Sequence, residues 1–306
     1  MAGWERALPD VLVMFDGKAI VEVHPDQGGA LGRYDIRVGE AIVEVFRTGT
    51  LRGRSGPFIL GCNVLVPFSN RISGGGFSYG GRFHPVPTPP GQKMPIHGNG
   101  LSLPWSVTAA TKTQTVLEHA SDGPGPFRYA AVLTYTLEAG SLTMKLEVRN
   151  AGDESLPFGL GFHPWFLRDQ QTRLSFRAQA YWTEDEDHLP DALCPTSKQD
   201  GFDFSSGAPL PDGWINNAFV GWDGNARIEW LTKRVGIDVT ASPPLRTLIV
   251  YSPWAAVDFF CLEPVSHSVD SHNRTEQGTA LPQVLAPDES LSAEVTLSPF
   301  SLAVTP

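Results

Sequence analysis

Hydrophobic and polar residues alternate with a period of two along much of this chain, which is the pattern of strands that bury one face. The clearest example is residues 127–150, where two alternating runs meet at Ala139 and Gly140 and predict a β-hairpin. No stretch keeps a helical period over several turns, so we expect an all-β protein with few, short helices. Similar runs predict further strands within 19–47 and at 226–230, 235–241, 246–252, 255–264 and 290–299.

Two regions depart from this alternation. Residues 61–100 are rich in glycine and proline, and we predict a long irregular loop with a functional role. After residue 168 the pattern also weakens, and residues 184–195 and 203–224 are interpreted as polar connections. The acidic run Glu184–Asp187 is interpreted as a solvated turn.

Residues 156–166, LPFGLGFHPWF, are apolar on both faces, as expected for a central strand in stacked sheets. The chain shows no internal repeat, low-complexity segment or obvious linker. A length of 306 residues is compatible with one large all-β unit. We therefore predict a single domain over residues 1–306 with the architecture of a large antiparallel β-sandwich.

Charge and composition exclude several classes of protein. The formal net charge is −10 and the basic residues form no cluster, which argues against a nucleic-acid partner. Glu5 and Asp10 interrupt the N-terminus where a signal peptide needs an apolar core, and 18 apolar residues never run together. We expect a soluble, cytoplasmic protein with no membrane partner, working as a monomer or a homodimer. The three cysteines are widely spaced, which argues against a disulfide framework and a structural zinc site.

Three residues form the minimum set for proton transfer near neutral pH, namely His163, His97 and Glu263. We expect His163 at the end of a buried strand and His97 in a glycine-rich loop. Glu263 ends an apolar run at a proline, where burial would raise the carboxyl pKa towards that of a general base. The alternatives are a core histidine bonded to backbone, and a structural carboxylate paired with Arg71 or Arg274.

Other chemistries have less support. The chain has no G-x-S-x-G elbow and no cysteine beside a histidine, which argues against nucleophilic catalysis. We expect no metal, because neither of two candidate sets has a recognised ligand spacing; the sets are His267, Asp270 and His272, and His84, His97 and His163.

Two features suit a polyhydroxylated ligand. Asn70 and Arg71 combine an amide with a five-donor guanidinium, although the arginine could equally pair with Glu263. Five tryptophans in turn-like segments could offer an apolar platform to a sugar ring, while each taken alone also fits core packing; they are Trp105, Trp165, Trp214, Trp222 and Trp254.

Five segments, in this order over nearly the whole chain, resemble the aldose 1-epimerase (galactose mutarotase-like) family. They are PFSNRI (67–72), IHG (96–98) followed by PWSV (104–107), GLGFHPWF (159–166), INNAFVGWDG (215–224) and CLEPVSH (261–267). The resemblance implies a β-supersandwich and the reversible interconversion of the α and β anomers of an aldose. It also implies that no metal or organic cofactor is required.

The resemblance further implies roles for single residues. His163 would donate a proton to the ring oxygen while Glu263 takes the proton of the C1 hydroxyl, and His97 would hydrogen-bond the sugar near its reacting end. We expect the side chains of His163 and Glu263 on opposite sides of a space as wide as a pyranose ring. The predicted substrate-binding residues are Asn70, Arg71, Asn216, Trp165 and His267.

The identity of the substrate stays open. Asn216 stands where galactose-active members of the family carry aspartate, and His97 has a different glycine context from theirs. A hexose phosphate is therefore an alternative substrate. A non-catalytic sugar-binding protein on the same fold is a second alternative, although it would have no need of an acid/base pair. A lyase acting on acidic polysaccharide is a third, against which the acidic composition speaks.

Overall fold

A computed structural model describes residues 11–47, 57–196 and 202–303. The described residues form an all-β structure whose helices are two short 3-10 turns, as the alternation predicts. Residues 1–10, on which the prediction of no signal peptide partly rests, lie outside this description. Within the described chain, no helix is long and apolar enough to cross a membrane.

The larger sheet contains eleven antiparallel strands. Strand β4 (Ala41–Glu44) pairs only with β3, beside the main path of this sheet. In spatial order, the main path is β1 (Leu12–Phe15), β2 (Ala19–His24), β3 (Ala30–Val38), β5 (Cys62–Leu65), β13 (Gly161–Leu167), β22 (Phe259–Val265), β21 (Thr247–Ser252), β18 (Ile215–Val220), β15 (Ala180–Glu184) and β16 (Pro190–Pro195).

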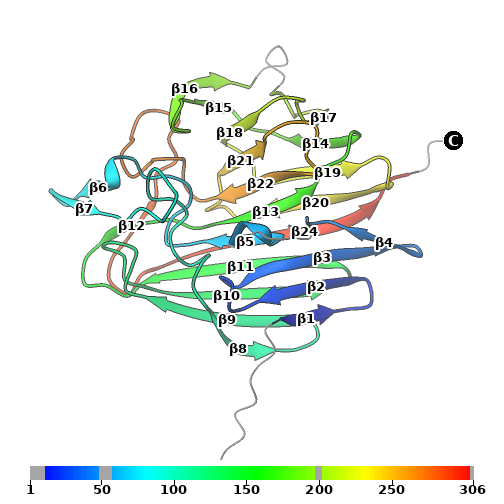
Figure 1. The fold of residues 1–306 in the computed structure, drawn as a ribbon, viewed down its shortest axis with the longest axis horizontal. Coiled ribbons are helices and arrows are strands. Elements are labelled where there is room, and N and C mark those ends of the chain that lie inside the picture. The colour runs from blue at the N-terminus through cyan, green and yellow to red at the C-terminus, as the bar shows by residue number, and fades with distance from the viewer. Residues whose placement is uncertain (1–10, 48–56, 197–201, 304–306) are drawn as a thin grey trace, which may run out of the picture.

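The second sheet contains nine antiparallel strands. Its spatial order is β17 (Ala208–Pro209), β14 (Thr172–Phe176), β19 (Asn225–Trp230), β20 (Val235–Ala241), β24 (Ser290–Ser301), β11 (Ser141–Asn150), β10 (Tyr129–Glu138), β9 (Gln114–Ser121) and β8 (Ser106–Ala110). Figure 1 looks onto the faces of the sheets: the larger sheet runs from β1 at the bottom of the view to β16 at the top, and the second sheet from β8 at the bottom to β17 near the top.

Four short strands and the two 3-10 turns complete the fold. They are the hairpin of β6 (Gly76–Tyr79) and β7 (Arg82–Pro85), the pair β12 (Leu156–Phe158) and β23 (Gln283–Leu285), η1 (Pro57–Ile59) and η2 (Ser73–Gly75). Strands β6, β7 and β12 gather with the orange segment after β22 at one end of the molecule, on the left of Figure 1.

The core fills the space between the two sheets. Strands β10 and β11 form the hairpin predicted at 127–150. Successive residues along each strand alternate between buried and less buried, as expected for a sheet with one face in the core. These side chains belong to one continuous apolar cluster that also includes Phe162 and Phe166 of β13. The same strand presents His163 and Trp165 to the opposite face of the larger sheet.

Three predicted connections were wrong. One of them, residues 184–195, contains β16, which lies at the edge of the larger sheet. Residues 61–100 are not wholly irregular, because they contain β5 and the hairpin β6–β7, whose turn places Gly80 and Gly81 at positive φ. Residues 203–224 contain β18, an interior strand of the larger sheet. Its two asparagines hid it in the sequence: Asn216 donates to Glu184, whereas Asn217 donates to the backbone carbonyl of Trp182.

Candidate active site

His163 and Glu263 lie side by side on two adjacent strands, β13 and β22. The register places Gly161 opposite Val265 and Trp165 opposite Cys261, so His163, midway between them, faces Glu263. Both residues lie inside their strands, although each was expected at a strand end next to a proline. Proline has no backbone N–H, so each strand loses one inter-strand hydrogen bond at its proline. The paired residues on either side of the proline keep the strands continuous.

The two side chains are in contact with each other. His163 Nε2 lies 3.3 Å from Glu263 Oε1, and the residues are only 5% and 3% exposed. The sequence prediction of one shared site holds, but the expected gap of a pyranose width between them does not. Contact between two desolvated polar groups offsets part of the cost of burying them.

Burial sets the protonation of this pair. Desolvation raises the pKa of Glu263 to about 8, and the nearby Arg71 guanidinium opposes part of that rise. Desolvation also lowers the pKa of His163 to about 3, helped by the positive charge of Arg47. At neutral pH the pair therefore holds one proton, which rests on the carboxyl group.

Two reciprocal hydrogen bonds with Asn70 hold His97 beside this pair. The Asn70 N–H donates to His97 Nδ1 at 3.0 Å, and the His97 N–H donates to the Asn70 carbonyl at 2.9 Å. Both residues have positive φ, a conformation that asparagine and histidine tolerate better than most. Because Nδ1 accepts, the neutral ring carries its proton on Nε2, with its centroid 5.4 Å from that of His163.

Arg71 stands between two carboxylates. Asn70 Oδ1 accepts from the backbone N–H of Arg71 at 2.9 Å and from its guanidinium at 3.3 Å, so the amide orients the arginine. Burial lowers the pKa of Arg71, while Glu263 and Glu184 act in the opposite direction. Arg274, the other partner considered for Glu263, pairs with Glu276 instead.

Aromatic and cationic groups cover His163. Trp165 stacks on its ring with a centroid distance of 4.8 Å, and the Arg47 guanidinium lies 4.0 Å from the Trp165 ring centre. Phe58 of η1 contacts His97, His163 and Trp165. Sequence reasoning missed Arg47 and Phe58, because neither belongs to a recognisable motif and both approach from a different part of the chain.

Three buried polar atoms of the site have no hydrogen-bond partner, namely Glu263 Oε2, His163 Nδ1 and Trp165 Nε1. Their residues are 3%, 5% and 8% exposed, so solvent does not readily satisfy them. Open donors and acceptors within one site are the groups that a hydroxylated ligand would engage.

His267, predicted to be a substrate-binding residue, makes hydrogen bonds within the protein. Its Nε2 accepts from the Ser69 N–H at 3.1 Å, and its Nδ1 lies 2.8 Å from the Ser268 carbonyl, so both ring nitrogens are engaged by the protein. Gly159 leaves room for this ring, because a Cβ there would meet it at 2.0 Å. The geometry suits a residue that holds the turn before Asn70, and contact with a sugar would require breaking these bonds.

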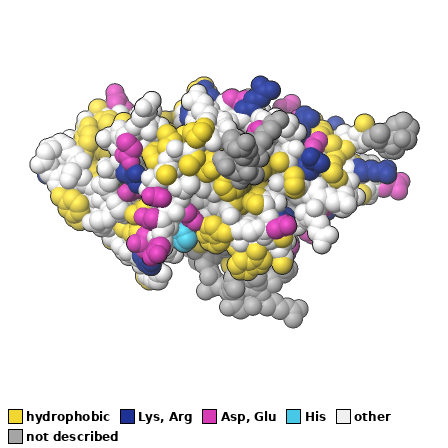
Figure 2. Space-filling model, turned by 90° about the horizontal axis from the view of Figure 1, so that it is seen from above, with side chains coloured by type: hydrophobic (Ala, Val, Ile, Leu, Met, Phe, Trp, Pro, Cys, Tyr) yellow, Lys and Arg dark blue, Asp and Glu magenta, His cyan; other side chains and the backbone are white. Residues whose placement is uncertain are grey.

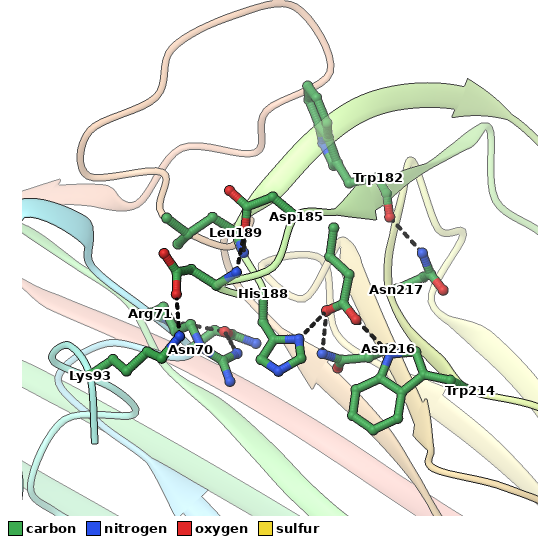
Figure 3. Close-up of polar contacts among 12 residues, drawn as sticks. Asn70, Arg71, Lys93, Trp182, Asp185, His188, Leu189, Trp214, Asn216 and Asn217 are labelled. Carbon is green, nitrogen blue, oxygen red and sulfur yellow. Dashed lines mark hydrogen bonds and ion pairs between the residues drawn. The ribbon is translucent and has the colours of Figure 1, made fainter. Parts of the chain in front are cut away.

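Asn216 lies in a polar pocket beside the acid/base pair. Its Nδ2 donates to Glu184 Oε2 at 2.6 Å, and Trp214 Nε1 donates to Glu184 Oε1 at 2.5 Å (Figure 3). His188 Nδ1 lies 3.1 Å from the same carboxylate. Asn70 and Arg71 line the pocket as well. In Figure 2, acidic side chains gather on one side of a histidine and hydrophobic side chains on its other side.

Glu184 is therefore a site residue that the sequence analysis interpreted as part of a solvated turn. Its side chain is 18% exposed, whereas the next three residues of the acidic run are exposed. The alternation of a strand was the signal that could have identified Glu184 as a site residue, because Trp182 and Glu184 lie on the same face of β15. The register of β15 with β18 was not readable from the sequence.

One set of potential metal ligands lies close together among the described residues. Ligand atoms of His163, Cys261 and Glu263 all fall within 4.8 Å of one another. Burial raises the pKa of the Cys261 thiol well above its usual range. A cation bound there would have to displace protons from the thiol and the carboxyl group, and would occupy the acid/base pair.

Comparison with known proteins agrees with this fold and site. The model of the aldose 1-epimerase family matches residues 10–298. The chain is 38% identical to the uncharacterized protein YphB of Escherichia coli K12 over 245 residues, which cover 77% of this chain and 82% of that protein. The chain belongs to the aldose 1-epimerase family.

Solved structures share the architecture. An Escherichia coli K12 protein provisionally assigned as an aldose 1-epimerase superposes with a TM-score of 0.86 and 33% identity, over 95% of this chain and 99% of that one. A galactose mutarotase-like protein from Clostridium acetobutylicum gives 0.80 and 21%, over 95% of each chain. The predicted β-supersandwich is confirmed.

Proposed function

We propose that this protein is an aldose 1-epimerase, an isomerase that interconverts the α and β anomers of an aldose by acid/base ring opening. The observation that carries the proposal is the buried pair of His163 and Glu263, which holds one proton and leaves Glu263 Oε2 without a partner. A sugar-binding site without catalysis has no use for two desolvated titratable groups 3.3 Å apart.

The reaction needs one proton removed and one supplied. The C1 hydroxyl gives its proton to the Glu263 carboxylate, the C1–O5 bond breaks, and His163 protonates the ring oxygen; the O–H electron pair becomes the C=O bond of the open aldehyde. Rotation about C1–C2 and the reverse steps give the other anomer. Because the resting proton is on Glu263, it must first pass to His163 across their 3.3 Å contact.

Neighbouring residues support this transfer. The positive charge of Arg71 favours the ionised form of Glu263. His97 presents its Nε2–H beside His163, where it can donate to an oxygen near C1. We propose that Trp165, Arg71 and Asn216 contact the sugar. Asn70 orients Arg71, and His267 acts as a positioning residue for the turn that carries them.

The first test is NMR exchange spectroscopy between the anomers of D-glucose, D-galactose and their 6-phosphates, with and without the protein. We expect accelerated exchange for at least one aldose. His163→Ala and Glu263→Gln should each lower kcat by roughly 10²- to 10⁴-fold, because each removes a positioned acid or base. Glu118→Gln, an exposed carboxylate on β9, is the matched control and should leave the rate unchanged.

Circular dichroism should show that both site variants remain folded. Near-normal turnover in either variant would remove that residue from the mechanism. Sugar binding by the wild type without any acceleration of exchange would favour the non-catalytic alternative.

A further inference from the structure

Glu184 lies at the far side of the site from the acid/base pair, on the same face of the same sheet. Strand β15 pairs Ala180 with Val220 and Trp182 with Ala218, so Glu184, two residues further on, faces Asn216. Asn216 in turn pairs with Tyr251 of β21. Tyr251 pairs with Cys261, which precedes Glu263 by two residues on β22. Three strand spacings, about 14 Å, separate β22 from β15, and the two glutamate side chains shorten that gap.

The Glu184 carboxylate is a pre-positioned acceptor. Trp214, Asn216 and His188 direct N–H or ring nitrogen atoms at it, as Figure 3 shows. A carboxylate has about four lone-pair positions, so the hydrogen bonds from Trp214 and Asn216 leave about two, at least one of them open to a ligand. Trp214 is 47% exposed, so its indole can offer an apolar face to a ligand bound near Glu184.

The turn that follows makes the entrance acidic. Asp185, Glu186 and Asp187 follow Glu184 directly and are exposed. Lys93 reaches across from the 86–100 segment and pairs with Asp187 at 2.6 Å. The remaining acidic side chains give this side of the pocket a negative field, which repels an anionic ligand.

We infer that Glu184 is a specificity-determining residue, which accepts a hydroxyl of an uncharged aldose at the end distal to C1 and, with the acidic turn, rejects sugars carrying a phosphate. This inference rests on the proposed function for the position of the sugar. A hydroxyl donates to the open carboxylate position, whereas a phosphate has only acceptors to offer there and adds a like charge.

The kinetic test compares wild type, Glu184→Gln and Glu186→Gln on D-glucose, D-galactose and their 6-phosphates by NMR anomer exchange. Wild type should prefer the uncharged aldose by roughly tenfold or more in kcat/KM. Glu184→Gln should raise KM for that aldose by roughly 10- to 100-fold, the effect of losing a charged acceptor, with little change in kcat. It should also weaken the discrimination against the phosphate. Glu186→Gln removes one charge of the exposed turn and should weaken only the discrimination against the phosphate. Glu118→Gln, exposed on β9, is the matched control and should leave KM for every sugar unchanged.

A second variant separates ligand contact from a structural role. Glu184→Gln combined with Asn216→Asp moves the carboxylate to the facing strand while keeping one acceptor and one amide, so it should recover part of the lost affinity. Asn216→Asp alone places two carboxylates together, and like-charge repulsion should weaken binding. A loss of kcat without a change in KM, a failed recovery in the double variant, or a wild type that prefers the phosphate would overturn the inference.

Binding without turnover keeps the two proposals distinguishable. 1,5-Anhydro-D-glucitol and 1,5-anhydro-D-galactitol lack the anomeric hydroxyl and cannot react, so calorimetry with them reports the distal contact alone. Binding that Glu184→Gln weakens supports the inference even if wild type accelerates no anomer exchange. Equal binding by wild type and Glu184→Gln refutes the inference even if the exchange reaction is fast.

Discussion

At the scale of single residues, environment reverses the ordinary protonation of the two central groups. An exposed histidine is partly protonated near neutral pH and an exposed glutamate is ionised. Here burial lowers the pKa of His163 and raises the pKa of Glu263, so the proton stays on the carboxyl group until a ligand redistributes it. Residue types predicted proton transfer, but only the packing around them decided which group holds the proton.

The pH dependence of catalysis follows from those two shifts. Between the lowered pKa of His163, about 3, and the raised pKa of Glu263, about 8, the pair keeps one proton. We expect kcat/KM to be flat from about pH 5 to 7.5 and to fall above about pH 8, when Glu263 loses that proton. NMR exchange rates, corrected for uncatalysed mutarotation at each pH, provide the measurement. A midpoint near 6.5 would instead indicate an ordinary, solvated histidine.

At the scale of elements, the segment after β22 buries two histidines that do no chemistry in the proposed reaction. Burial lowers the pKa of His267 to about 4 and that of His272 to about 3. His272 Nε2 lies 3.0 Å from the Pro157 carbonyl, and its ring packs among three phenylalanines, Phe68, Phe77 and Phe127. These rings tie the segment to β12 and to the turn that carries Asn70.

This packing predicts acid sensitivity. A buried neutral histidine stabilises the fold fully above its unfolded pKa of about 6.5, and this contribution is lost as the pH falls towards the folded value. Each such group costs about 1.4 kcal/mol of unfolding free energy per pH unit in that window. His272→Phe should reduce the slope of unfolding free energy against pH, between pH 6 and 4.5, by the contribution of one histidine, about 1.4 kcal/mol per pH unit. Urea unfolding at several pH values measures this slope. An unchanged slope would show that His272 is not the titrating group.

At the scale of the whole molecule, one apolar cluster joins both sheets. It extends from Met14 of β1 to Leu297 of β24, and so includes strands from both ends of the described chain. A single domain over residues 1–306 stays a prediction, which this continuous core of the described residues favours. The monomer-or-homodimer state and the cytoplasmic location likewise stay predictions.

A continuous core predicts cooperative unfolding. We expect one calorimetric transition at neutral pH, coincident with the change in tryptophan fluorescence, because the tryptophans are distributed over both sheets. A bound aldose should move the whole transition to higher temperature, since it binds only the folded state. Two resolved transitions, or a shift confined to part of one, would contradict the single-domain prediction.

The sequence by itself determined the all-β class, the hairpin at 127–150 and the late strands, because these follow from local alternation. The expectation that His163 and Glu263, far apart in the chain, share one site rested on the resemblance to the family. Tertiary structure alone decided that the two groups touch, that His267 is engaged by Ser69, and that Glu184 faces the pocket with Asn216. Strand register and desolvation produce those outcomes, and both depend on contacts between segments far apart in the chain.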